Sequence, residues 1–259
     1  GYGEEFGNVI HGNYPGDETF FPEDLQKAGI RTVSAQAHFY FNKDKAGFHQ
    51  GFDVWEIVPG LKKSNTSDEN ITSPQHTELA LKELGDPANT KGRFFAWYHM
   101  LDPHDAYQKH PEGKDFGTKQ PQLYDGEIYF TDMHVKKILD FVDAQPWGKK
   151  TVVIITADHG ETFGEHKMYR HGFELWEVLT HVPLMIRGPG IKPRKIDEPR
   201  SMIDLAPTIL DVFGVAPDPL FRGTSLVPEC TGGDAKARDV ITDLARTTDK
   251  ESRRTLLRG

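Results

Sequence analysis

The chain has 259 residues, which is enough for one sizeable α/β domain. Its formal net charge of -8 argues against a protein that binds the nucleic-acid backbone, because such proteins usually carry a basic face. An acidic protein still binds anionic esters where a metal ion or local basic groups supply positive charge. The sequence has no run of about 20 apolar residues, so it predicts no membrane segment. Cys230 is the only cysteine, which excludes a disulfide within the chain.

In chain order, the first half predicts two helix–strand pairs. Residues 22–28 predict a helix that Gly29 ends, and residues 31–38 predict a strand. Residues 77–84 predict a second, short helix. Residues 94–101 are aromatic and almost continuously apolar, which is typical of a buried strand.

The second half continues this alternation. Residues 124–144 predict a helix with one buried face, because apolar side chains recur at helical spacing at Ile128, Val135, Ile138, Leu139 and Val142. Strands are predicted at residues 151–156, 182–186 and 239–244. Between the last two strands, residues 204–213 predict a helix that is capped by its first residue.

Strands that alternate with helices indicate an α/β fold with a mostly parallel central sheet and helices on both faces. We expect a single domain over residues 1–259 that is incomplete at both ends, because the chain starts without a methionine and stops without a cap signal. In sheets of this kind, ligands bind at the carboxyl ends of the strands.

Three of the predicted strands run into histidines or carboxylates. The first strand runs into His38, the second into Asp102 and His104, and the strand that ends at residue 156 into Asp158 and His159. The carboxyl ends of parallel strands meet at one rim, so these three independent strand ends predict a site there.

Asp158 and His159 are the candidate metal ligands. A carboxylate and a neutral imidazole bind divalent ions, and Gly160 lets the backbone turn closely past the metal. Alternatively, Asp158 caps the following turn and His159 packs as a polar core residue, and the three residues alone do not decide. The metal interpretation is favoured by the side chains that follow, Glu161, Glu165, His166 and His171.

Three other histidines are candidates for contact with a substrate. His104 could bind or protonate an ester oxygen, since an imidazole donates a proton near neutral pH. Asp-Pro is also a common turn starter, so the alternative is an exposed turn that Asp102 orients. His38 ends a strand, and His171 lies in a loop expected to face the same rim; each is a weaker candidate by itself. Cys230 has no nearby histidine and is interpreted as a bystander thiol.

Five motifs occur in a fixed order along the chain. They are Asp-Pro-His-x-x-Tyr at residues 102–107, Tyr-x-x-Glu-x-x-x-x-Asp at 124–132, Asp-His-Gly-Glu followed by Gly-Glu-His at 158–166, Val-Pro-Leu before Gly-Pro-Gly within 177–190, and Ile-Asp-Leu-Ala-Pro-Thr-Ile-Leu-Asp at 203–211. Together they resemble the sulfatases of the alkaline phosphatase superfamily, from about residue 21 to the end of the chain. The resemblance implies an alkaline phosphatase-like fold.

The resemblance also implies roles for individual residues. Asp158 and His159 would be metal ligands, with calcium the usual ion. His104 would contact the ester group or assist the leaving group. His171 stands where many sulfatases have a substrate-binding lysine, and His38 corresponds to a histidine at the end of an early strand. His38, His104 and His171 are therefore the expected catalytic residues, and the last two the expected substrate contacts.

Two features depart from the family pattern. Gln36 stands where sulfatases often have a lysine, which removes one positive charge from the oxyanion site. The family nucleophile is a cysteine or serine, converted to formylglycine within Cys/Ser-x-Pro-x-Arg, and this chain contains no such segment. We therefore expect a partial catalytic domain that begins downstream of the nucleophile and is inactive alone.

The predicted function is metal-dependent hydrolysis of a sulfuric ester, carried by a small molecule or a glycan. One alternative is a metal-dependent phosphoesterase, phosphonate hydrolase or phospho-group transferase of the same superfamily. The other is a catalytically inactive sulfatase-like fragment. No nucleic-acid partner is predicted. The substrate, the oligomeric state and the localisation stay open, with a periplasmic or secreted parent protein as one option.

Overall fold

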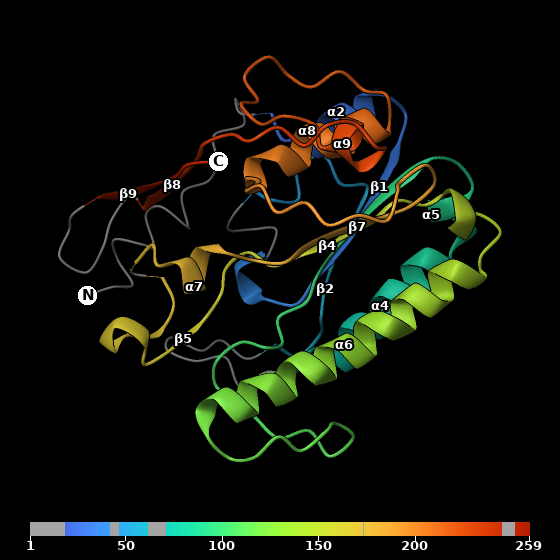
Figure 1. Ribbon diagram of the computed structural model, residues 1–259. Helices are drawn as coiled ribbons and strands as arrows, with labels where there is room; N and C mark the ends of the chain where they lie inside the picture. Colours follow the sequence, from blue (N-terminus) through green and yellow to red (C-terminus); the bar gives the residue numbers. More distant parts are fainter. Residues whose placement is uncertain (1–18, 42–46, 62–70, 173, 245–251) are drawn as a thin grey trace. The chain divides into compact units, whose positions relative to one another are not determined.

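The computed structural model describes residues 19–41, 47–61, 71–172, 174–244 and 252–259, except the side chain of Phe39. The chain divides into two compact units, Gly1–Gln145 and Pro146–Gly259, and each is described by itself (Figure 1). The single domain expected from the sequence stays a prediction, because two such units can belong to one domain.

The first unit contains a parallel sheet of three strands. These are β1 (Arg31–Gln36), β2 (Val54–Ile57) and β3 (Phe94–His99), in the order β2-β1-β3. Every residue of β1 after Arg31 is buried. Successive side chains of a strand point to opposite faces, so both faces of the sheet are covered at β1. The predicted parallel α/β sheet is therefore confirmed, although the sequence did not predict β2.

The helices of the first unit are α2 (Phe21–Lys27), α4 (Ser73–Gly85), α5 (Pro87–Thr90) and α6 (Gln120–Ala144). Helices α2, α4 and α5 contact β1, and α4 and α6 run side by side (Figure 1). Helix α4 begins four residues before the predicted start, with Pro74 in its first turn, where the missing N–H is tolerated. None of the described helices is both long and apolar enough to cross a membrane.

The buried face of α6 differs from the predicted one. Ile128 is 44% exposed, whereas Glu127, Phe130, His134 and Val142 are the buried residues of the helix. Burying a side chain such as Phe130 contributes about 1.5–3 kcal/mol. Glu127 and His134 are polar, and they are buried because other polar groups of the same unit contact them. The apolar pattern thus predicted the helix but placed its inner face incorrectly near the N-terminal end.

The described strands of the second unit form two-stranded sheets. The pairs are β4 (Val153–Thr156) with β7 (Leu184–Arg187), β5 (Thr162–Phe163) with β6 (Tyr169–Arg170), and β8 (Val240–Leu244) with β9 (Arg253–Leu257). All three described pairs are antiparallel. The parallel strands of the fold therefore lie in the first unit.

The helices of the second unit are α7 (Glu177–Thr180), α8 (Leu205–Val212) and α9 (Val227–Cys230). Asp204 precedes α8, but its carboxylate does not cap this helix. It accepts hydrogen bonds from the backbone of Ser201 and Thr224 and pairs with Arg238. Asp204 is 1% exposed, so it fastens loops of this unit together instead of capping a helix.

Short 3-10 turns complete the two units, at η1 (Phe39–Phe41), η2 (Gly148–Lys150), η3 (Glu165–Lys167) and η4 (Met202–Asp204).

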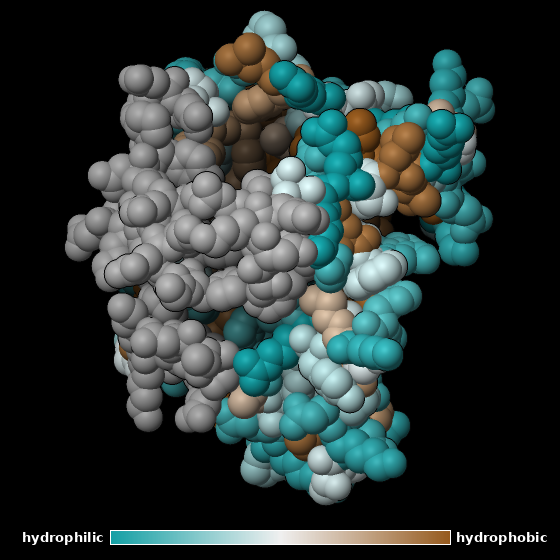
Figure 2. Space-filling view, turned by 90° about the vertical axis from the view of Figure 1, so that its left-hand side faces the viewer, coloured by the Kyte–Doolittle hydropathy of each residue, from teal (hydrophilic) through white to brown (hydrophobic). Residues whose placement is uncertain are grey.

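Hydrophilic side chains cover most of the coloured surface in Figure 2, with smaller hydrophobic areas between them. This agrees with a composition in which 27% of the residues are charged.

Candidate functional site

His38 and His104 lie at the carboxyl ends of the neighbouring strands β1 and β3, and their ring centroids are 6.4 Å apart. The first unit thus brings together two of the histidines that the sequence predicted to meet at the rim. Asp158, His159 and His171 belong to the second unit. Their convergence with His38 and His104 stays a prediction.

The ring of His104 has a defined hydrogen-bonding role. Its Nδ1 lies 2.8 Å from the backbone oxygen of Asp105. A carbonyl oxygen can only accept a hydrogen bond, so Nδ1 carries the proton. In the neutral imidazole, Nε2 of His104 therefore carries the lone pair and is the basic nitrogen.

His38 has the opposite arrangement. The backbone N–H of Tyr40 donates to its Nδ1 at 3.1 Å, so this nitrogen accepts. In neutral His38 the proton therefore sits on Nε2, which is a donor. The ring also packs edge-on against the Tyr40 ring, at 4.2 Å between centroids. The two histidines thus offer one acceptor and one donor at the ends of adjacent strands.

Asp102 orients the start of the segment that carries His104. Its carboxylate accepts hydrogen bonds from the backbone N–H of Ser73 at 2.8 Å and of Thr72 at 3.2 Å. These groups lie at the N-terminal end of α4, where unpaired N–H groups and the helix dipole favour an anion. Asp102 is 4% exposed. The structure thus supports the interpretation that Asp102 orients the turn.

Gln36 does not act as the family lysine would. Its side chain is fully buried, and its Nε2 donates to the Ser34 hydroxyl at 2.6 Å. The amide is therefore used in a contact along β1, and it carries no charge in place of a lysine.

Asp158 and His159 follow β4 in the second unit. The Nδ1 of His159 lies 2.8 Å from the carbonyl oxygen of Gly160, so Nδ1 donates and Nε2 carries the lone pair in the neutral ring. This Nε2 lies 3.8 Å from Asp158 Oδ2, and the Asp158 side chain is 74% exposed. A carboxylate oxygen and an imidazole lone pair so close together fit two ligand positions of one cation.

By themselves, these two side chains do not make a metal site. Among the described residues there is no group of three or more histidine, cysteine, aspartate or glutamate side chains that could hold a metal ion. Calcium takes 6–8 oxygen ligands, so the Asp158 carboxylate fits it, whereas an imidazole nitrogen such as that of His159 is a more usual ligand of transition metals. The pair does not complete the coordination of either kind of ion.

Gly160 fixes the turn behind His159. Its N–H donates to the backbone oxygen of Leu179 at 2.8 Å. A Cβ at this position would lie 2.0 Å from the backbone oxygen of Val178, which no side chain tolerates. The close approach to α7 therefore requires glycine here, in agreement with the close backbone turn predicted from the sequence.

His171 joins the same group through Glu161. The Nδ1 of His171 lies 3.1 Å from Glu161 Oε2 and 3.3 Å from Oε1. Glu161 is 7% exposed, and the rings of His159 and His171 stack at 4.0 Å between centroids. Because a carboxylate accepts, the Glu161 contact holds a proton on His171 Nδ1. Sequence reasoning included Glu161 in a motif but did not recognise that it orients His171.

Two other residues of this segment do not join the group. The His166 ring stacks on Trp176 at 3.8 Å, and the Glu165 carboxylate accepts from the backbone N–H of Phe163. Both have structural roles here and do not support the metal interpretation. Burial raises the pKa of the Cys230 thiol, which disfavours the reactive thiolate and agrees with a bystander role.

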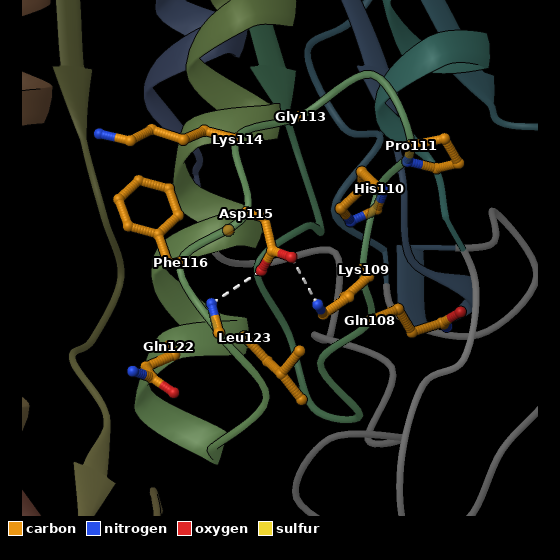
Figure 3. A pocket seen from close by; sticks show the side chains of 12 residues that line it. Gln108, Lys109, His110, Pro111, Gly113, Lys114, Asp115, Phe116, Gln122 and Leu123 are labelled. Atoms are coloured by element: carbon orange, nitrogen blue, oxygen red, sulfur yellow. Dashed lines mark hydrogen bonds and ion pairs between the residues drawn. The ribbon is translucent and has the colours of Figure 1, made fainter.

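A cavity of about 250 Å³ lies between residues 108–117 and the first turns of α6. Two of the residues that line it, Lys109 and Asp115, form an ion pair of 2.8 Å, and Asp115 also accepts a hydrogen bond from the Gly117 N–H (Figure 3). None of the predicted site residues lines this cavity. His110 lines the cavity, and it belongs to the segment that follows His104 in the chain.

Comparison with known proteins adds three findings. The family model described as Sulfatase matches residues 2–215. Arylsulfatase K of Mus musculus is 32% identical over 178 residues, which cover 66% of this chain and 32% of the mouse protein. The chain thus matches about a third of the length of this curated relative.

Two solved structures share the fold. A 2-O GAG sulfatase aligns with a TM-score of 0.71 at 17% identity, over 95% of this chain and 64% of that chain. The phosphonate monoester hydrolase of Agrobacterium radiobacter aligns with a TM-score of 0.67 at 18% identity, over 90% of this chain and 66% of that chain. At such identities the likeness shows the fold alone.

Proposed function

Because this chain belongs to the sulfatase family of the alkaline phosphatase superfamily, we propose that it forms part of the catalytic domain of a sulfuric ester hydrolase. The observation that carries the proposal is the arrangement of ring nitrogens. His104, His159 and His171 each have Nδ1 held by an oxygen acceptor, whereas Nδ1 of His38 is held by a donor. Such fixed tautomers assign one chemical role to each Nε2.

His38 and His104 are the proposed catalytic pair. The leaving oxygen of a sulfate ester gains negative charge as its bond to sulfur breaks, and it needs a proton. His104, whose neutral Nε2 is basic, takes up a proton at this nitrogen and gives it to the leaving oxygen. Neutral His38 donates a hydrogen bond from its Nε2–H to an oxygen of the ester group and keeps its proton.

Asp158 and His159 are the proposed ligands of a divalent metal ion, with calcium as the expected ion. Bound there, the ion would neutralise part of the negative charge of the ester group. His171 is the proposed substrate contact beside them. Glu161 keeps the His171 ring in one orientation, and in the imidazolium form its Nε2 donates to an anionic oxygen.

We propose a class of substrate for the parent protein, but no nucleophile from this chain. Sulfatases use formylglycine as nucleophile, and we assign no residue of this chain to that role. A sulfated glycan is the proposed substrate class, because the GAG sulfatase shares the fold over most of this chain. Small aryl sulfates serve as test substrates, since they need only the ester-binding groups.

A phosphonate or phosphate ester hydrolase is the second candidate, because the phosphonate monoester hydrolase shares the same fold. Both esters place an anionic group with similar geometry at the site. The ratio of kcat/KM for an aryl sulfate to that for an aryl phosphonate in the parent protein discriminates the two. A ratio below one would favour the second candidate.

The direct test uses the full-length protein that contains this chain. Asp158→Ala should lower aryl sulfate turnover by at least about a hundredfold, whereas the surface control Asp140→Ala should leave it unchanged. Near-normal turnover in Asp158→Ala would overturn the proposal. Turnover by the 259-residue chain itself would refute the alternative that it is an inactive fragment.

A further inference from the structure

We propose that Glu127 is a positioning residue for His104. It holds the His104 loop, defined as residues 100–119 between β3 and α6, against helix α6. The inference rests on the proposed function only in so far as His104 takes part in the reaction. The contact itself is a property of the first unit and can be tested without any activity.

Both oxygens of the Glu127 carboxylate contact the His104 loop. Oε1 accepts a hydrogen bond from the backbone N–H of Gln108 at 2.7 Å, and Oε2 lies 3.0 Å from Nε2 of His110. One side chain thus contacts two loop residues on either side of Lys109. The hydrogen bond from Gln108 is to a carboxylate oxygen, and bonds to a charged acceptor are stronger than neutral ones. The His110 ring adds a close electrostatic contact with the other oxygen.

This contact is shielded from water. The side chains of His110 and Glu127 are 3% and 5% exposed. The His110 ring stacks on the Phe130 ring, at 3.7 Å between centroids and 6° between planes. The His134 ring packs edge-on against the same Phe130 ring, at 4.8 Å between centroids. The His110 ring therefore cannot leave Glu127 without losing its stacking on a residue that is 1% exposed.

A second contact holds the loop on the other side of His104. The Thr131 hydroxyl donates to the backbone oxygen of Asp102 at 2.9 Å. Thr131 and Glu127 are four residues apart on α6, so they lie on the same face, one turn from each other. His104 thus stands between two attachment points on one helix, at Asp102 and Gln108.

The arrangement explains a buried carboxylate that the reaction does not use. Burial raises the pKa of Glu127, while the Gln108 N–H and His110 oppose the shift. Removing one partner of such a buried pair leaves the other unsatisfied, which is costly. The matching substitution is Glu127→Gln, which keeps the shape and one acceptor oxygen but loses the second acceptor and the charge.

The experiment uses the full-length protein, with hydrogen-exchange mass spectrometry on peptides that cover residues 102–110. Glu127→Gln should raise amide exchange there by about tenfold or more, with the second half of α6 unchanged. Asp140→Asn is the matched control, because it removes a carboxylate that pairs with Lys136 on the exposed side of the same helix. This control should leave the exchange of the loop unchanged. If Glu127→Gln fails to fold, His110→Gln tests the same contact from the loop side.

Turnover of an aryl sulfate supplies the second readout. Glu127→Gln should lower kcat by about tenfold with little change in KM, and it should cause no further loss in a His104→Ala background. An equal loss in both backgrounds would overturn the proposal, because Glu127 would then not act through His104. Unchanged exchange in Glu127→Gln would also overturn it. Absence of sulfate turnover in the unsubstituted protein would refute the proposed function instead, and the exchange result would still decide whether Glu127 holds the loop.

Discussion

The rings of His38 and His104 lie 6.4 Å apart between centroids, at 46° between planes, with Nδ1 in opposite hydrogen-bonding roles. In His38 this nitrogen accepts from the Tyr40 N–H, and in His104 it donates to the Asp105 carbonyl. Two neutral histidines therefore differ in what they can do at Nε2, although they are chemically identical side chains. The backbone of each strand end determines the difference.

This difference predicts that His104 matters most for poor leaving groups, because its Nε2 can take up a proton and release it. His104→Gln keeps a polar side chain but cannot give up a proton. For aryl sulfates with weakly acidic phenols, kcat of the full-length protein should fall by about 10²–10⁴-fold, the usual contribution of general acid catalysis. For strongly acidic phenols the loss should be much smaller. Equal losses across the series would mean that His104 is not the proton donor.

Glu161 is predicted to act by orienting His171. Glu161→Gln should lower kcat/KM for an aryl sulfate by about tenfold or more, because a neutral amide with one acceptor oxygen holds the Nδ1 proton less strongly than a carboxylate does. Glu177→Gln is the matched control. It breaks another Glu–His contact of the same unit, with His181 at 3.4 Å, but both of these side chains are largely exposed. Equal effects of the two substitutions would contradict an orienting role.

Calcium is predicted to stabilise the full-length protein through Asp158 and His159. A ligand present at 100 times its Kd stabilises the folded state by about 2.7 kcal/mol, so Tm should rise with calcium and fall with a chelator. In Asp158→Ala the rise should disappear, since one of the two proposed ligands is lost. The measurement is thermal unfolding with and without calcium. A shift that persists in the variant would place the ion elsewhere.

Glu83 is predicted to make the stability of the first unit depend on pH. Burial raises the pKa of Glu83 to about 7, and Tyr98 and Lys82 oppose this only in part. The folded state thus prefers the protonated acid. Its contribution to stability is complete below the unfolded pKa near 4.5 and is lost as the pH rises through 7.

Glu83→Gln should therefore gain stability relative to the unsubstituted chain between pH 5 and pH 8, by up to about 3 kcal/mol. The measurement is the free energy of unfolding in denaturant at both pH values. Glu78→Gln, on the exposed side of the same helix α4, is the control and should show no such trend. A difference that stays constant with pH would show that Glu83 is not the titrating group.

Some of this architecture could be predicted from the sequence, for identifiable reasons. β3 was predicted because its run of aromatic and apolar residues is almost continuous, and β1 was predicted after the helix that Gly29 ends. His38 and His104 lie close together because parallel strands end at one edge. β2 was missed because it has four residues, one of them charged, and presents no pattern of its own. It is a strand because β1 pairs with it.

The sequence could not reveal what holds each site residue in place. The apolar stripe through Ile128 predicted a different inner face for α6, and the burial of Glu127 was not predicted. Glu127 is buried because it contacts Gln108 and His110 of the His104 loop. These contacts depend on how a segment without regular structure folds back onto α6. The tautomers of His38 and His104 likewise depend on single backbone groups of Tyr40 and Asp105.

Attachment of the His104 loop at Glu127 has a consequence for how such a domain can diversify. The part of the loop past the last attachment point begins at Pro111, and Pro111 and residues 113–117 line a cavity of about 250 Å³ with the start of α6 (Figure 3). Insertions or replacements in this stretch would reshape the surface beside the site while His104 keeps its place. One helix thus separates a part of the loop that must stay constant from a part that is free to vary.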